Sequence, residues 1–195
     1  MTPTATDADP ALLAVAVAAH RFGLGEATLA RVGADPVAWL LAQVGPADAQ
    51  RGDGLPTLAD GVRSHREFLA QQRRRSVAPE MAGAADLRSG EQQFGDHFRP
   101  MVQADLRAHL GTAAATERPF TERLAMFWAN HFTVSIAKAN TRALVGAFER
   151  EAVRPHIGGR FEDLLKAAVT HGAMLRYLDN EQSAGPASRV AQQRG

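Results

Sequence analysis

Two adjacent polar residues, Asn130 and His131, lie in the most aromatic stretch of the chain, FWANHF at 127–132. Aromatic residues make up only 6% of the 195 residues, so this clustering stands above the background of the sequence. In a helix over 119–132, His131 shares one face with the apolar residues four, seven and eleven positions before it. We therefore expect the imidazole of His131 to face the protein interior.

An interior histidine beside an amide can do chemistry. The functional interpretation makes His131 a general base or a metal ligand, held by aromatic packing and oriented by Asn130 or by a carboxylate. Histidines on apolar helix faces are more often core residues whose hydrogen bonds are satisfied. Both interpretations stay open from the sequence.

The segment HGAMLRYLDN at 171–180 provides a second set of polar residues. Asp179 is a candidate carboxylate partner for a histidine or a metal, although Asp and Asn also favour helix ends and turns. Because no local metal-binding spacing such as H-E-x-x-H occurs, a metal site requires distant residues. The metal candidates are His131, His171 and Asp179.

The residue types suit hydrolytic or metal-assisted chemistry. Histidine would act as base or ligand and a carboxylate would orient it, while Arg123 or Arg154 would bind an anion. The catalytic candidates are therefore His131, Asp179, Asn130 and Arg123. The alternative is a non-catalytic interaction module, in which the Asn, His and Asp residues form a buried hydrogen-bond network that fixes helix packing.

Composition excludes several classes of function. The chain has no cysteine, which removes disulfides, thiolate catalysis, Fe–S clusters and cysteine zinc sites. A net charge of +1 gives no strong field toward nucleic acid, and no aromatic residues interleave with the basic run Arg73–Arg75. The start lacks the basic residues of a secretory signal, and the apolar run at 11–19 is too short to span a membrane. These features predict a cytoplasmic protein without excluding export, with no nucleic-acid partner and no membrane span.

The stretch HRFGLG at 20–25 contains a G-x-G pattern. A nucleotide-binding loop of this kind follows a strand, whereas a helix precedes these glycines. No nucleotide cofactor is therefore expected, and the cofactor content is otherwise open. The glycines are typical of a helix end with His20 and Arg21 in its last turn, and an anion site that uses Arg21 remains an alternative.

Helical periodicity and helix-forming residues dominate, so the sequence predicts an all-α fold, an irregular multi-helix bundle in one domain over 1–195. Residues 1–9 and 181–195 are expected to be flexible, 45–56 to form a loop and 76–90 a mobile connector. The expected helices cover 10–21, 26–32, 36–44, 58–77, 91–110 (started or interrupted near Pro100), 119–132, 139–153, 161–169 and 173–178.

Five sequence blocks occur in an order that resembles a bacterial family, domain of unknown function 1800 (DUF1800). The blocks are AAHRFGLG at 18–25, WLLAQ at 39–43, ERLAMFWANHFTVS at 122–135, GAFEREAVRPHIGGRFEDLL at 146–165 and MLRYLDNEQSAGP at 174–186. The resemblance implies a largely helical protein of unestablished role, with a protein partner encoded nearby that is related to sulfatases and alkaline phosphatases. It also implies that the family chain continues past Gly195, so we expect an N-terminal part of a longer protein and a bundle that is incomplete. A helix beyond Gly195 would add carboxylates to a site shared with His131 and Asp179.

Overall fold

Helices joined by turns and loops make up the described part of the computed structural model, residues 9–26, 28–77 and 89–193. No β-strand occurs in these ranges, and the all-α prediction is confirmed. Most of the predicted flexible start at 1–9 and most of the predicted connector at 76–90 lie outside the described residues.

Nine α-helices and five shorter helical turns follow one another in the described residues. The α-helices are α1 (Pro10–Phe22), α2 (Pro36–Leu41), α3 (Leu58–Val77), α4 (Gly90–Ala115), α5 (Pro119–His131), α6 (Val145–Phe148), α7 (Phe161–Thr170), α8 (Gly172–Tyr177) and α9 (Arg189–Gln193). The turns η1 (Leu29–Arg31), η3 (Ala139–Thr141), η5 (Arg154–His156) and η6 (Asn180–Gln182) are 3-10 helices, and η4 (Glu149–Val153) is a π-helix.

Local sequence signals explain where several helices begin. Asp9 and Asp35 each accept a hydrogen bond from a backbone N–H of the first turn, at 3.0 Å from Ala11 and 2.9 Å from Ala38. A proline follows each aspartate at the first helical position, where its missing N–H costs nothing.

The expected break near Pro100 is wrong, because α4 runs through this proline without interruption. The helix begins instead at Gly90, after the N-cap Ser89, and the side chains of Ser89 and Gln92 cap each other's backbone N–H groups. A proline inside a helix costs about 3 kcal/mol, and tertiary packing offsets this cost. Phe98, just before the proline, is fully buried, and α4 packs along both α3 and α6.

The predicted helix over 139–153 is also not regular. It is divided into η3, α6 and the π-helical η4, in which the N–H of Arg154 donates to the carbonyl of Glu149 five residues earlier. This wider turn brings the side chains of Glu149 and Arg154 within 3.1 Å of each other. π-Helical turns occur often at functional sites, and this one lies beside the cavity described below.

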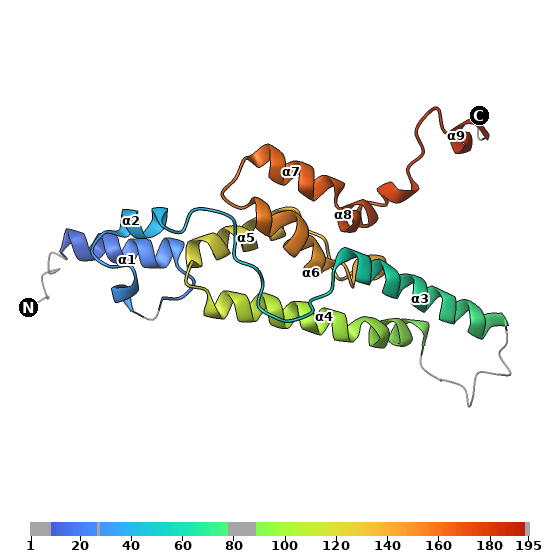
Figure 1. Ribbon diagram of the computed structural model, residues 1–195, viewed down its shortest axis with the longest axis horizontal. Coiled ribbons are helices and arrows are strands. Elements are labelled where there is room, and N and C mark those ends of the chain that lie inside the picture. The colour runs from blue at the N-terminus through green and yellow to red at the C-terminus, as the bar shows by residue number, and fades with distance from the viewer. Residues whose placement is uncertain (1–8, 27, 78–88, 194–195) are drawn as a thin grey trace, which may run out of the picture.

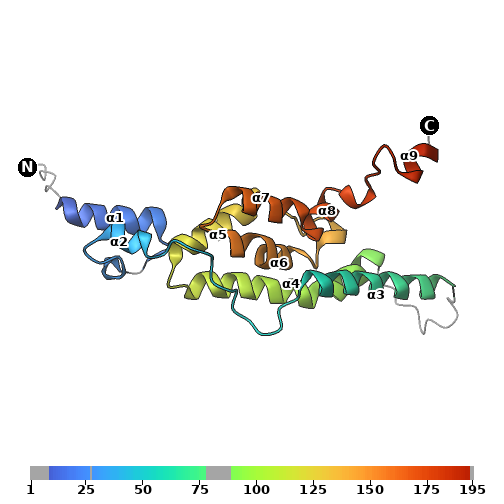
Figure 2. The same cartoon turned by 45° about the horizontal axis from the view of Figure 1, so that its top comes forward.

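The molecule is elongated, with α1 and α2 at one end and the paired helices α3 and α4 extending toward the other (Figure 1). Helices α7 and α8 cover α5 and the α6–η4 segment, as the turned view also shows (Figure 2). The main apolar core lies here, and smaller clusters lie under α1 and between α3 and α4. The main core contains Ala125, Val134, Leu144, Phe148, Ala152, Val153, Ile157, Leu164, Ala168, Ala173 and Met174.

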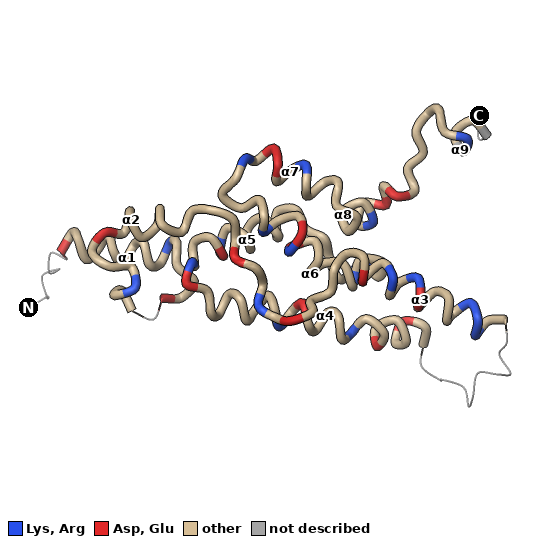
Figure 3. Tube along the Cα trace, viewed as in Figure 1, with Lys and Arg blue, Asp and Glu red and all other residues tan. Residues whose placement is uncertain are grey.

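Charged residues of both signs alternate along the chain (Figure 3), so no element except the basic end of α3 carries a long run of one sign. Within the described ranges, no helix combines the length and the apolar character that crossing a membrane requires.

The predicted loop at 45–56 is confirmed, but it begins earlier, at residue 42, because α2 ends at Leu41 and not at the predicted residue 44. Arginines from distant elements fix the loop over 42–57 in place. Arg118 donates to the carbonyls of Gln43 and Pro46, at 2.8 Å and 3.0 Å. Arg154 donates to the carbonyl of Asp48 at 2.8 Å. Since loop carbonyls otherwise need water as a partner, these contacts hold the loop against the core.

One glycine allows this loop to approach the core closely. Gly158 has a φ of +75°, and a Cβ at this position would lie 2.8–2.9 Å from backbone atoms of Gly45. We expect Gly158→Ala to lower the free energy of unfolding by about 2 kcal/mol, from left-handed strain and overpacking. Gly54→Ala is the matched control, because Gly54 has a φ of +60° but open space around it. Urea denaturation should therefore show a larger loss for Gly158→Ala, and equal losses would contradict the proposed contact.

Candidate functional site

The structure places the leading sequence candidate, His131, at the protein surface. Helix α5 forms as predicted, but His131 is exposed and stacks at 6.0 Å on Phe127, itself 55% exposed. The expectation that the imidazole faces inward is wrong. The buried face of α5 is formed by smaller and polar residues instead, including Glu122 and Ala125, because this face must approach η4 closely and pair with Arg154.

The other predicted ligands have separate partners. Asp179 adopts a left-handed conformation at an exposed turn and pairs with the Nζ of Lys138 at 2.7 Å. The Nε2 of His171 lies 3.2 Å from the Oε2 of Glu151. Among the residues that the structure describes, no group of three or more His, Cys, Asp or Glu side chains could hold a metal ion. The chain as described therefore does not assemble His131, His171 and Asp179 into a metal site.

Two predicted residues do come together. Arg123 and Asn130 both line a groove of about 560 Å³ between α1 and α5. The guanidinium of Arg123 donates to the carbonyl of Gly23, with its Nε at 3.0 Å. Asn130 also lines a second cavity on another side of α5.

A buried ion network links α5 to η4. The side chain of Arg154 is 3% exposed and forms a paired contact with Glu122, from Nη1 to Oε1 at 2.9 Å and from Nη2 to Oε2 at 2.6 Å. Its Nη1 also donates to Glu149 at 3.1 Å. Two parallel hydrogen bonds from guanidinium to carboxylate are among the stronger polar interactions in proteins, so Arg154 fixes both acids in place.

The network continues to His109 on α4, whose Nδ1 lies 3.0 Å from the Oε2 of Glu149. The hydrogen bond to Glu149 raises the pKa of His109 above its ordinary 6.5, against the opposing effect of burial. Burial raises the pKa of Glu149, but His109 and Arg154 outweigh it and the net shift is downward. Glu149 is therefore a carboxylate at neutral pH and orients the imidazole. No hydrogen bond to the Nε2 of His109 occurs within the described residues.

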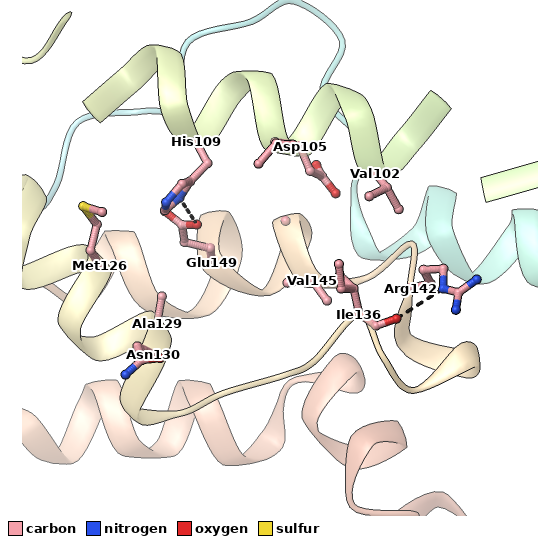
Figure 4. Close-up of a pocket in the computed structure, with 12 residues that line it drawn as sticks. Val102, Asp105, His109, Met126, Ala129, Asn130, Ile136, Arg142, Val145 and Glu149 are labelled. Carbon is pink, nitrogen blue, oxygen red and sulfur yellow. Dashed lines mark hydrogen bonds and ion pairs between the residues drawn. The ribbon is translucent and has the colours of Figure 1, made fainter. Parts of the chain in front are cut away.

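His109 and Glu149 lie on the wall of a cavity of about 440 Å³ between α4, α5 and the α6–η4 segment (Figure 4). Small-molecule sites in proteins commonly span about 300–1,000 Å³ and are mostly apolar with few convergent polar groups. This cavity fits that description. Its lining residues are Val102, Asp105, Leu106, His109, Met126, Ala129, Asn130, Ile136, Arg142, Val145, Gly146 and Glu149.

A second carboxylate, Asp105, lies one turn before His109 on the same face of α4. Burial raises its pKa, and Arg150, whose Nη1 is 2.8 Å from Oδ1, opposes this without cancelling it. The cavity therefore holds two titratable groups with raised pKa values, a common feature of sites that transfer protons.

The structure thus defines an all-α protein in which an ion network orients a histidine beside an apolar cavity. Residues 17–188 match the family described as Protein of unknown function (DUF1800), and the chain belongs to this family. Comparison with the curated proteins and with the solved structures found no match. The family resemblance inferred from the sequence blocks is confirmed.

Sequence reasoning missed Asp105, His109 and Glu149. One signal was available, because Asp105 and His109 are four residues apart in an amphipathic helix and so share a face. Glu149 gave no local signal. Its role depends on the π-helical turn and on Arg154, and neither follows from residue spacing alone.

Proposed function

We propose that this protein is an acid–base enzyme that uses His109 to activate water against a small, mostly apolar substrate. The observation that carries the proposal is the His109–Glu149 pair on the cavity wall, with the imidazole Nε2 left without a protein partner in the described residues. A neutral imidazole in this position accepts a proton from water, and Glu149 stabilises the imidazolium that forms. The lining residues include no Ser, Thr, Lys or Tyr, so water is the nucleophile that the cavity favours.

The remaining polar groups support this assignment. Glu149 is a positioning residue, held by Arg154 and hence by Glu122. Asp105 has a raised pKa and lies on the same cavity wall as His109, where it adds a second polar group beside the substrate. Arg142 also lines the cavity, where it donates to the carbonyl of Ile136 at 3.2 Å and contributes a positive charge.

The test is hydrolysis of p-nitrophenyl butyrate, a small apolar ester, followed by release of p-nitrophenolate. General-base catalysis contributes about 10²–10⁴-fold, so His109→Gln should lower the rate by a factor in this range. The control is His20→Gln, because His20 is exposed in the last turn of α1, outside the residues that line the cavity. Equal rates for the parent, His109→Gln and His20→Gln would refute the proposal.

The pH profile separates catalysis from structure. Because the pKa of His109 lies above 6.5, the rate should rise with pH and level off only above that value. Glu149→Gln removes the carboxylate that raises this pKa, so the profile should move to lower pH. A purely structural role would change stability and leave any profile in place.

The second candidate is a non-catalytic module whose buried charges fix helix packing. The four hydrogen bonds of the Arg154 guanidinium, to two carboxylates and to the carbonyl of Asp48, favour it. It predicts no ester hydrolysis above buffer and a loss of stability in every variant of the network.

A further inference from the structure

We infer that the groove between α1 and α5 binds a small amphipathic monoanion, such as an alkyl or aryl carboxylate. This groove, called here the α1–α5 groove, is lined by Phe22, Phe120 and Phe127, by Arg21 and Arg123, and by Asn130. Its volume is about 560 Å³, which lies within the range of small-molecule sites.

The apolar part of the ligand would lie against phenylalanine rings. Phe22 of α1 and Phe120 of α5 pack edge to face at 5.7 Å and hold the two helices together at the groove. Phe127 lies two turns further along the same side of α5 and is 55% exposed. A large apolar side chain that stays exposed beside a groove is available for contact with an apolar ligand.

The charges in the α1–α5 groove are all positive. Its charged lining residues are Arg21 and Arg123, and no carboxylate lines it. Over residues 9–26, 28–77 and 89–193, the side chain of Arg21 makes no hydrogen bond or ion pair, and it is exposed in the last turn of α1. Glu26, the acidic residue that follows α1, lies 3.5 Å from Arg31 instead.

Arg123 is fixed at the groove in a defined position. Its Nε and Nη2 both donate to the carbonyl of Gly23, so the guanidinium is oriented before a ligand arrives. A guanidinium has five N–H donors, and these contacts leave others free to bind an anion. One oriented arginine, and one whose side chain has no partner in the described part of the chain, both lie beside aromatic rings and match a carboxylate joined to an apolar tail.

This site is separate from the proposed hydrolytic centre. Met126 and Asn130 line both cavities, but His109 and Glu149 line only the other one. His109→Gln should therefore leave binding in the α1–α5 groove unchanged. A negative result in the hydrolysis assay would therefore not contradict binding in the α1–α5 groove. A negative result in the binding assay would likewise not contradict the proposed hydrolysis.

The test is isothermal titration calorimetry of the full chain with sodium octanoate. We expect Arg21→Gln to weaken octanoate binding by about tenfold or more, because the variant loses a charge-assisted hydrogen bond to the carboxylate. Phe127→Ala should also weaken it while leaving both charges in place. Arg160→Gln is the matched control, because Arg160 is exposed and lies outside the groove.

Each comparison has a defined outcome. Weaker binding of 1-octanol than of octanoate, and loss of octanoate affinity at high salt, would support the inference. Equal affinity of octanoate for the parent and for Arg21→Gln, with the fold verified by circular dichroism, would overturn it. Tighter binding of an apolar peptide with a free C-terminal carboxylate than of octanoate would also overturn it, because the groove would then fit a protein segment.

Discussion

Replacing Arg154 with methionine is expected to lower the free energy of unfolding by about 3–5 kcal/mol, the usual cost of removing one partner of a buried ion pair. The side chains of Arg154 and Glu122 are only 3% and 2% exposed, so water cannot replace the lost guanidinium. The variant leaves the Glu122 carboxylate buried without its charged partner. Glu149 keeps His109 as a second partner, so the cost arises mainly at Glu122.

A second substitution tests this explanation. In Arg154→Met combined with Glu122→Met, the unpaired carboxylate is gone, and the double variant should be more stable than Arg154→Met alone. Arg160→Met is the surface control, because Arg160 and its partner Glu162 are 79% and 77% exposed and should contribute little. Urea denaturation of the four proteins measures all of these differences. A double variant that is less stable than the single one would contradict the buried-charge account.

The second large effect concerns His65 on α3, which we expect to make the protein less stable in acid. His65 is 5% exposed and packs on Phe98 at 4.3 Å between ring centroids. Burial lowers its pKa from 6.5 to about 4, and the charges of Arg176 and His97 act in the same direction. The folded protein therefore holds His65 neutral in a range where the unfolded chain protonates it.

The direction of the pH dependence follows from this difference. Above pH 6.5 the imidazole of His65 is neutral in both the folded and the unfolded state, so its protonation does not reduce the free energy of unfolding. Between pH 6.5 and about 4 the unfolded chain binds more protons, so stability falls as pH falls, by roughly 3 kcal/mol in total. Below about pH 4 the imidazole is protonated in both states and this loss is complete.

His65→Phe tests this prediction, because phenylalanine keeps the aromatic packing and does not titrate. Above pH 6.5 the difference in unfolding free energy between the parent and His65→Phe should stay constant. Between pH 6.5 and about pH 4 the unfolding free energy of the parent should fall faster than that of His65→Phe. His20→Gln, at an exposed histidine, should follow the parent. Parallel curves for the parent and His65→Phe would show that His65 does not titrate in this way.

Most helix boundaries could be predicted from local chemistry. Asp9-Pro10 and Asp35-Pro36 begin helices because a capping carboxylate and a proline satisfy the first turn within a few residues. The family followed from sequence blocks, and the match over residues 17–188 confirmed it. These features need no knowledge of distant parts of the chain.

The candidate site was predicted poorly because burial is not a local property. The aromatic stripe with His131 and the face with Glu122 are both parts of one helix, and the sequence alone favours burial of the aromatic one. Tertiary structure buried the other face, since Glu122 pairs with Arg154 across 32 residues of chain. The same holds for His109 and Glu149, which are 40 residues apart.

The sequence by itself determined that this chain is helical, where most of its helices begin, and the family to which it belongs, because capping, periodicity and residue order act over short distances. Only the tertiary structure decided which face of α5 is buried, where α6 widens into a π-helix, and which acids meet Arg154. Those outcomes depend on desolvation and ion pairing between segments that are far apart in the chain, and no short stretch of residues encodes them.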